Sequence, residues 1–101
     1  MTPWTVPAQR KLFKVHKYAA KENRAAADRL IYRIYEAANY LEKFPHMGRP
    51  GLVINIRELI VPGTPYILRY RIRAGVARVI DIKHGKQKDF RRFVAGAAGH
   101  S

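Results

Sequence analysis

Residues 66–84 read YILRYRIRAGVARVIDIKH and carry the clearest structural signal in this chain. Apolar side chains alternate with charged ones on both sides of Ala74-Gly75, and a two-residue link of this kind joins antiparallel strands. The pattern therefore predicts a β-hairpin with strands Tyr66–Arg73 and Val76–His84.

A third strand is expected upstream, over Ile54–Val61, where the same alternation occurs. The turn-forming residues 62–65 separate it from the hairpin, so the three strands are expected to form an antiparallel meander. Pairing Arg73 with Val76, and Val61 with Tyr66, divides the side chains between two faces. The expected core face carries Leu59, Val61, Tyr66, Leu68, Tyr70, Ile72 and Val79. The second face carries Glu58, Ile67, Arg69, Arg71, Arg73, Arg78, Ile80, Ile82 and His84. A slip of one residue would exchange the two faces.

The residues before the Pro/Gly-rich joint 45–51 have helical periodicity instead. One helix is expected over about Ala8–Lys21, and a second from the N-cap Asn23 to about Lys43. Their apolar stripes are expected to pack as an antiparallel hairpin on the core face of the sheet. The stripes consist of Ala8, Leu12, Val15 and Ala19 in the first helix and of Ala26, Leu30, Ile34, Ala37/Ala38 and Leu41 in the second.

Two shorter elements are expected at the ends of the chain: an edge strand near Pro3–Val6 and a last helix over Lys88–Ala95. The sequence thus predicts an α+β fold. In it, an N-terminal antiparallel helical hairpin packs on a three- to four-stranded antiparallel sheet.

The composition points to a basic single domain covering residues 1–101. Twenty Lys and Arg stand against seven Asp and Glu, a formal net charge of +13, which favours a polyanionic or acidic partner. The absence of cysteine excludes a disulfide scaffold, a thiolate zinc site and a cysteine nucleophile. No apolar run has the length of a signal-peptide core or a membrane span, so a cytoplasmic protein without membrane contacts is expected.

The arginines of the second face are the first candidate site. Arg71 and Arg78 lie opposite each other in the expected register, which is unfavourable in a sheet. Guanidinium groups match carboxylates and phosphates, so Arg69, Arg71, Arg73 and Arg78, with Glu58, predict a surface for an acidic or polyanionic partner. A solvated edge of a basic protein is the alternative.

The other candidates also have two interpretations each. His84, between Lys83 and Gly85, is either a general base or a structural histidine at a strand end. Glu58 is either an acid/base group or the cross-strand ion-pair partner of Arg69. The basic stripe on the first helix is either a solvated face or a phosphate-binding surface; it consists of Arg10, Lys14, Lys17 and Lys21.

Packing in the core or at an interface is expected for the tyrosines Tyr32, Tyr35, Tyr40, Tyr66 and Tyr70. No nucleotide-binding motif is present, and the histidines lack metal-ligand spacing, so no metal or cofactor is implied.

Three stretches, in this order, carry a resemblance to a known family. Leu41–Arg49 contains a Pro-x-x-Gly-Arg turn. Arg57–Arg71 contains an Arg-Glu-Leu strand and a Pro-Tyr-x-x-x-Tyr-Arg strand, and Val79–Gly85 ends in His-Gly. Over about residues 4–88 the chain resembles the RelE/ParE superfamily of bacterial type II toxin–antitoxin toxins.

The resemblance implies a helical hairpin on an antiparallel sheet and an acidic cognate antitoxin that wraps the toxin. RelE-like members are metal-free ribonucleases that cut mRNA on the ribosome, whereas ParE-like members inhibit DNA gyrase. The ribonucleases carry an arginine and a late tyrosine where this chain has Ile67 and Phe90. The resemblance therefore favours a ParE-like gyrase inhibitor that is not an enzyme.

Two alternatives remain open. One is a RelE-like mRNA endonuclease in which His84 is the base or acid and Arg57, Arg71 and Lys86 clamp the phosphate. The other is a basic nucleic-acid-binding module without toxicity.

Overall fold

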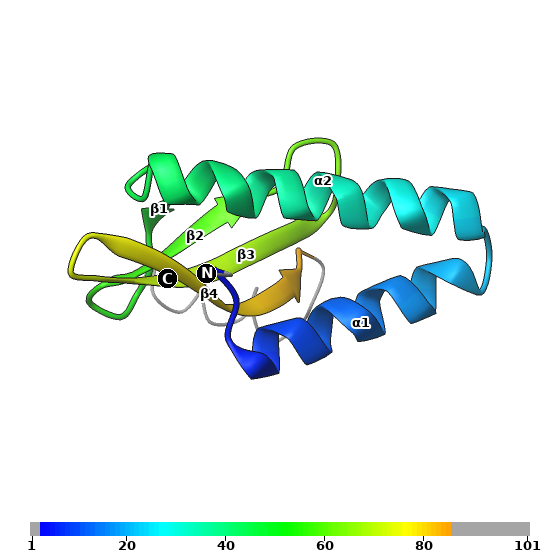
Figure 1. Ribbon diagram of the computed structural model, residues 1–101, viewed down its shortest axis with the longest axis horizontal. Coiled ribbons are helices and arrows are strands. Elements are labelled where there is room, and N and C mark those ends of the chain that lie inside the picture. The colour runs from blue at the N-terminus through cyan, green and yellow to red at the C-terminus, as the bar shows by residue number, and fades with distance from the viewer. Residues whose placement is uncertain (1–2, 86–101) are drawn as a thin grey trace, which may run out of the picture.

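The computed structural model describes residues 3–85, which form two helices and a four-stranded antiparallel sheet (Figure 1). The elements are α1 (Val6–Ala20), α2 (Arg24–Lys43), β1 (Arg49–Pro50), β2 (Ile56–Ile60), β3 (Tyr66–Arg73) and β4 (Val76–His84). The strands lie in the order β1-β2-β3-β4. The helices form an antiparallel hairpin over one face of this sheet, so the predicted α+β fold is confirmed.

Side-chain caps and prolines set the helix boundaries. Thr5 caps α1 by accepting a hydrogen bond from Ala8 N at 3.3 Å, which starts the helix at Val6 rather than at Ala8. Asn23 caps α2, as predicted, because its Oδ1 accepts from Ala26 N at 2.9 Å. The second helix ends before Pro45, since the residue preceding a proline is disfavoured in helical conformation.

The predicted register of the meander is confirmed at both turns. Arg73 pairs with Val76 and Arg71 with Arg78. Leu59 pairs with Leu68, and Glu58 with Arg69.

A β-bulge in β4 corrects the predicted faces beyond this point. Arg69 pairs with Asp81 and Tyr70 with Val79, so Ile80 has no partner on β3. The extra residue exchanges the faces of all following side chains. Ile82 therefore lies in the core opposite Leu68, and His84 lies opposite Tyr66, rather than both lying on the second face.

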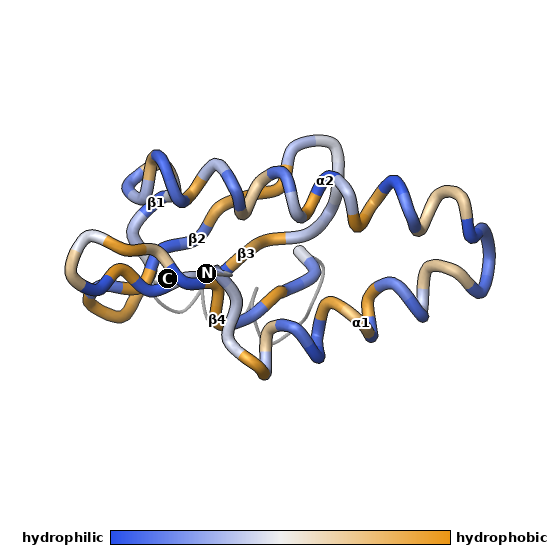
Figure 2. Tube along the Cα trace, in the orientation of Figure 1, coloured by the Kyte–Doolittle hydropathy of each residue, from blue (hydrophilic) through white to orange (hydrophobic). Residues whose placement is uncertain are grey.

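The core lies between the helical hairpin and the sheet. Apolar segments of α1, α2 and the strands turn toward each other along the molecule (Figure 2). The fully buried members include Ala8, Ile34, Ala38, Leu41, Val61, Leu68 and Tyr70. Small alanines at the helix contact permit close approach of α1 and α2. In the first turn of α2, Ala27 rather than the expected Ala26 is buried.

The predicted edge strand, the predicted start of β2 and the predicted last helix each need a comment. Residues near Pro3–Val6 form only an isolated bridge between Trp4 and Val79, and the fourth strand is β1 instead. Strand β2 begins at Ile56 rather than Ile54, because Asn55 has a left-handed backbone (φ 66°) that ends the extended chain. The helix expected over Lys88–Ala95 lies outside the described residues.

Within residues 3–85, neither helix has an apolar stretch of the length and hydropathy needed to cross a bilayer.

Candidate functional site

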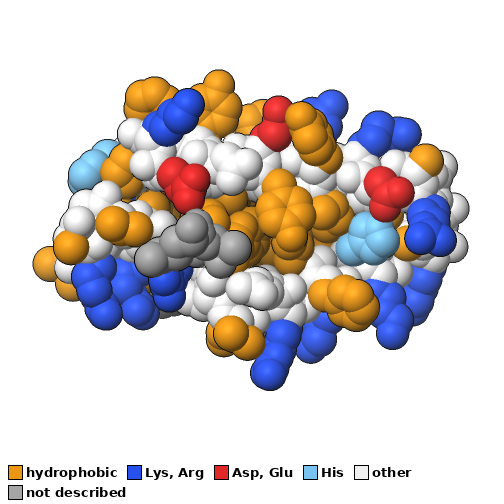
Figure 3. Space-filling view, viewed as in Figure 1, with side chains coloured by type: hydrophobic (Ala, Val, Ile, Leu, Met, Phe, Trp, Pro, Cys, Tyr) orange, Lys and Arg blue, Asp and Glu red, His pale blue; other side chains and the backbone are white. Residues whose placement is uncertain are grey.

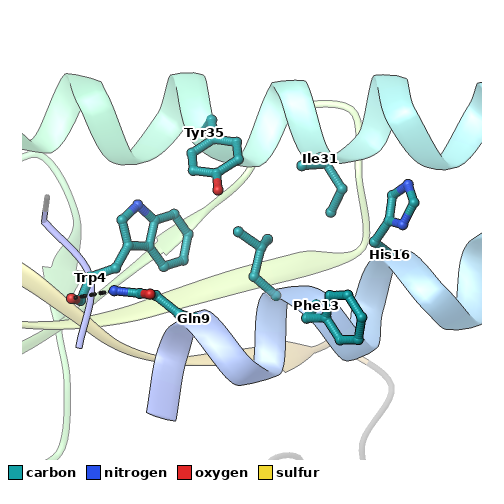
Figure 4. Close-up of a pocket in the computed structure, with 7 residues that line it drawn as sticks. Trp4, Gln9, Phe13, His16, Ile31 and Tyr35 are labelled. Atoms are coloured by element: carbon teal, nitrogen blue, oxygen red, sulfur yellow. Dashed lines mark hydrogen bonds between the residues drawn. The ribbon is translucent and has the colours of Figure 1, made fainter. Parts of the chain in front are cut away.

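A groove of about 390 Å³ opens between α1 and α2 (Figure 4). Its lining consists of Trp4, Gln9, Leu12, Phe13, His16, Ile31 and Tyr35. The Trp4 and Tyr35 rings meet edge to face, with centroids 5.7 Å apart. Phe13 is 67% exposed beside them, although large aromatic side chains are usually buried. The groove therefore offers an apolar surface to a partner.

Contacts with the sheet and between the helices fix the walls of this groove. Thr5 N donates to Val79 O at 3.0 Å, and Val79 N donates to Pro3 O at 2.6 Å, so Trp4 is tied to β4. At the other end, His16 Nε2 and Asp28 Oδ1 lie 2.8 Å apart and join the two helices. Contacts at both ends thus fix the positions of the groove's walls.

A second depression, of about 570 Å³, continues from the first along α2. Its lining consists of Tyr32, Tyr35, Glu36, Asn39, Tyr40, Lys43 and Phe44, so Tyr35 belongs to both. The rings of Tyr40 and Phe44 stack with centroids 6.1 Å apart. Hydrophobic side chains follow this face of the molecule between and along the helices (Figure 3).

The exposure of three tyrosines on α2 excludes the core, one of the two environments that the sequence predicts for them. Tyr32, Tyr35 and Tyr40 are exposed and do not lie in the core, whereas Tyr70 is fully buried and Tyr66 packs against the core. The sequence contains part of this signal, because Tyr32 lies on the side of α2 opposite Ile34 and Leu41, with Tyr35 and Tyr40 on the two flanks. Sequence analysis missed the groove itself, which depends on how α1 packs against α2.

The three described nuclease candidates lie in different places. Arg57 donates through Nη1 to Gly48 O, on the side of the sheet where Tyr70 is buried. The His84 ring lies against Tyr66, with centroids 5.1 Å apart. Arg71 lies on the opposite face, five residues along β3 from Tyr66, or about 17 Å at roughly 3.3 Å per residue. The structure does not bring these three side chains into one cluster, and Lys86 lies outside the described residues.

Acidic side chains of the described residues approach one end of the arginine face. Glu58 lies across from Arg69, but its Oε1 pairs with Arg49 Nη2 at 3.5 Å. Asp81, on the other side of Arg69, pairs with Lys11 at 3.3 Å and Lys83 at 3.6 Å.

At the other end, Arg71 and Arg73 are exposed on β3, and Arg78 is exposed opposite Arg71 on β4. Among residues 3–85, no carboxylate lies within ion-pair distance of Arg71 or Arg73. Within residues 3–85, the predicted arginine surface thus has acids near Arg69 and none within ion-pair distance of Arg71 or Arg73.

A buried hydroxyl fastens the loop before β1 to the sheet. Tyr70 Oη donates to Pro45 O at 2.7 Å and accepts from Gly48 N at 2.9 Å. Burial raises the pKa of the Tyr70 hydroxyl above its usual value of 10.0, although the Gly48 hydrogen bond and the Arg57 charge act in the opposite direction. Tyr70 and Arg57 therefore hold the same turn, which gives Arg57 a structural contact.

In the part of the chain from Pro3 to Gly85, no three acidic or histidine side chains are arranged to hold a metal ion. The described surfaces include an aromatic groove on the helices and exposed arginines at one end of β3.

Comparison with known proteins identifies the family. The model of the ParE toxin of type II toxin–antitoxin systems (parDE) matches residues 3–89. The protein Y4kP of Sinorhizobium fredii, named as a toxin, is 36% identical over 85 residues, covering 84% of this chain and 88% of that protein. Toxin RelE2 of Caulobacter vibrioides is 32% identical over 81 residues, covering 80% of this chain and 90% of that protein.

A solved structure from the chromosomal ParDE toxin–antitoxin system of P. aeruginosa shares the fold. It aligns with a TM-score of 0.70 and 21% identity, over 80% of this chain and 90% of that chain. Because the family model spans most of the sequence, this protein belongs to the ParE toxin family of type II toxin–antitoxin systems, within the RelE/ParE superfamily.

Proposed function

We propose that this toxin inhibits growth by binding DNA gyrase and not by chemistry of its own. The observation that carries the proposal is the separation of His84, Arg57 and Arg71 in the sheet. Phosphodiester cleavage needs a base and cations within reach of the same phosphate. The match of residues 3–89 to the ParE toxin family model supports the same conclusion.

Gyrase supercoiling and cleavage-complex assays with the purified toxin test this proposal. We expect loss of supercoiling or accumulation of cleaved DNA at micromolar toxin. Codon-phased cuts in mRNA on translating ribosomes, with unchanged gyrase activity, would contradict it. An induced pulse of toxin in cells without antitoxin is the matching experiment, and DNA synthesis is expected to stop before translation.

The RelE-like endonuclease is the second candidate, because the chain is also 32% identical to a protein named Toxin RelE2. In that case His84→Ala would abolish mRNA cleavage. In the gyrase-inhibitor proposal, the same substitution leaves inhibition intact, since the His84 ring packs against Tyr66.

We also propose that the aromatic groove binds an acidic, amphipathic segment of the cognate antitoxin. The groove supplies apolar area, and the net charge of +13 attracts an acidic chain. Phe13→Asp is expected to weaken antitoxin binding at least tenfold, as truncation of a central aromatic anchor does. Val6→Asp is the control, because Val6 is exposed at the start of α1 and does not line the groove. Equal antitoxin affinity for both variants would contradict this assignment.

A further inference from the structure

The loop between β1 and β2 exposes three consecutive apolar side chains. Leu52 and Val53 are more than half exposed, and Ile54 is 86% exposed. Isolated apolar residues at a surface need no explanation, but a run of three branched side chains in one loop does. We call Leu52, Val53 and Ile54 the apolar tip.

Backbone hydrogen bonds hold the apolar tip in place. Gly51 N donates to Ile56 O at 2.7 Å, and Ile56 N donates to Val53 O at 3.1 Å. Ile72 N, on β3, donates to Asn55 O at 3.1 Å and fixes the loop against the sheet. The exposure of Ile54 is therefore built into the fold, and binding through the tip loses little conformational entropy.

Arg71 and Arg73 border the apolar tip, and no carboxylate in the described part of the chain lies within ion-pair distance of either. The same Ile72 bond places the tip beside the end of β3, where Arg71 and Arg73 are exposed. Val76, the first residue of β4 after the β3–β4 turn, is 57% exposed. In Figure 1 this turn and the β1–β2 loop project together at the end of the molecule opposite the α1–α2 turn, and Figure 3 shows cationic and apolar side chains gathered there.

We propose that the apolar tip, with Arg71 and Arg73, is the surface through which this toxin docks on its cellular target protein. The inference rests on the proposed function, in which the toxin acts by binding a protein. The complementary target surface is an apolar pocket bordered by carboxylates. Branched aliphatic side chains fill such a pocket, and guanidinium groups at its margin pair with carboxylates.

The favoured partner is a protein rather than a nucleic acid or a lipid surface. Phosphates would satisfy the two arginines but leave three aliphatic side chains in water. A loop fixed by three backbone hydrogen bonds suits a shaped protein pocket. The tip also lies at the far end of the sheet from the helical turn, so a target could be contacted by residues that do not line the groove of Trp4 and Phe13.

Two variants test this docking surface, each with a matched control. Ile54→Asp places a charge in the apolar tip, and Val6→Asp places the same charge at an equally apolar, exposed site at the start of α1. Arg73→Glu reverses a bordering charge, and Lys14→Glu makes the same change on the exposed face of α1. Antitoxin affinity, measured for every variant, reports whether the toxin has folded.

We expect Ile54→Asp and Arg73→Glu to reduce growth inhibition and gyrase affinity by about tenfold or more, as loss of a central contact does. Antitoxin affinity should stay within about twofold of that of the unmodified toxin. The apolar tip lies far from the groove proposed to bind the antitoxin, and substitutions at distant sites act independently. The two controls should retain growth inhibition. A fully toxic Ile54→Asp variant would overturn the assignment.

The remaining outcomes separate this inference from the gyrase proposal. If the toxin inhibits growth without binding gyrase, the gyrase proposal fails, and loss of toxicity in Ile54→Asp still supports the docking surface for another protein. Vesicles of anionic phospholipid test the lipid alternative: if Ile54→Asp abolishes vesicle binding but leaves gyrase affinity unchanged, the protein-docking assignment is overturned. A toxin that neither inhibits growth nor binds gyrase contradicts both proposals.

Discussion

The Tyr70 hydroxyl makes two hydrogen bonds within the described core. It is fully buried, and it bonds both Pro45 O and Gly48 N. Tyr70→Phe removes the hydroxyl and leaves the Gly48 amide and the Pro45 carbonyl without this partner. We expect a loss of about 1–3 kcal/mol in the free energy of unfolding at neutral pH, the usual cost of unsatisfied buried polar groups. Urea denaturation of the two proteins measures it.

The same pair of proteins has a predicted pH dependence. Burial raises the pKa of Tyr70 above 10.0 in the folded protein, so above that pH the unfolded chain releases a proton that the folded chain retains. The stability that the folded protein gains from the neutral Tyr70 hydroxyl is therefore complete below pH 10.0. It is lost as pH rises through the folded-state pKa of Tyr70. The Phe variant lacks this loss, so the stability difference should narrow above pH 10. A constant difference at all pH values would show that Tyr70 does not ionise differently in the two states.

Glycine is required at position 48 because the surrounding atoms leave no room for a side chain. A Cβ atom there would lie 2.6 Å from Glu58 O and 2.7 Å from Tyr70 Oη. Gly48→Ala is expected to destabilise the protein by about 1–3 kcal/mol, as overpacking does. Since Tyr70→Phe removes one of the obstructing atoms, the double variant should lose less stability than the sum of the two single losses. Strict additivity would contradict the shared contact.

At the scale of elements, the two side-chain caps differ in the quality of their hydrogen bonds. The cap distance is 2.9 Å at Asn23 and 3.3 Å at Thr5. Asn23→Ala is expected to cost about 0.5–2 kcal/mol, as N-cap removal does. Thr5→Ala should cost less if distance reflects bond strength. Thermal unfolding followed by circular dichroism checks both, and a larger effect at Thr5 would contradict this ranking.

The strands and their register could be predicted because two turns and a period of two determine them. The bulge could not, since Ile80 and Ile82 are both isoleucine and the apolar pattern continues through the irregularity. For the exposed tyrosines, the sequence predicts either the core or an interface, because tyrosine suits both environments. Only the packing of α1 on α2 decides which of these two environments each tyrosine occupies.

The candidate sites were less predictable than the fold. The arginine face was visible in the sequence, but its division depends on which carboxylates the chain brings near, as at Glu58 and Asp81. The apolar tip could not be predicted from the sequence, because Ile54 extends the apolar alternation of Ile56 and the pattern therefore predicts that Ile54 belongs to the strand. The left-handed backbone of Asn55, which separates Ile54 from β2, has no strong signal in the sequence.

For the whole molecule, charge should control how fast partners meet. A formal charge of +13 attracts an acidic antitoxin over a distance set by salt screening. Raising sodium chloride from about 0.05 M to about 0.5 M should lower the association rate at least tenfold and change the dissociation rate much less. Stopped-flow mixing measures both rates. An association rate that is independent of salt would show that steering makes no contribution.

The bulge at Ile80 also bears on how the family can vary in length. Removing one residue from a strand normally inverts every side chain that follows. In β4 the ladder already passes over Ile80, so a chain without it keeps Val79 opposite Tyr70, Asp81 opposite Arg69 and Ile82 opposite Leu68. A natural relative that is one residue shorter here can retain the same core, and an alignment gap belongs at Ile80 rather than in the flanking turns.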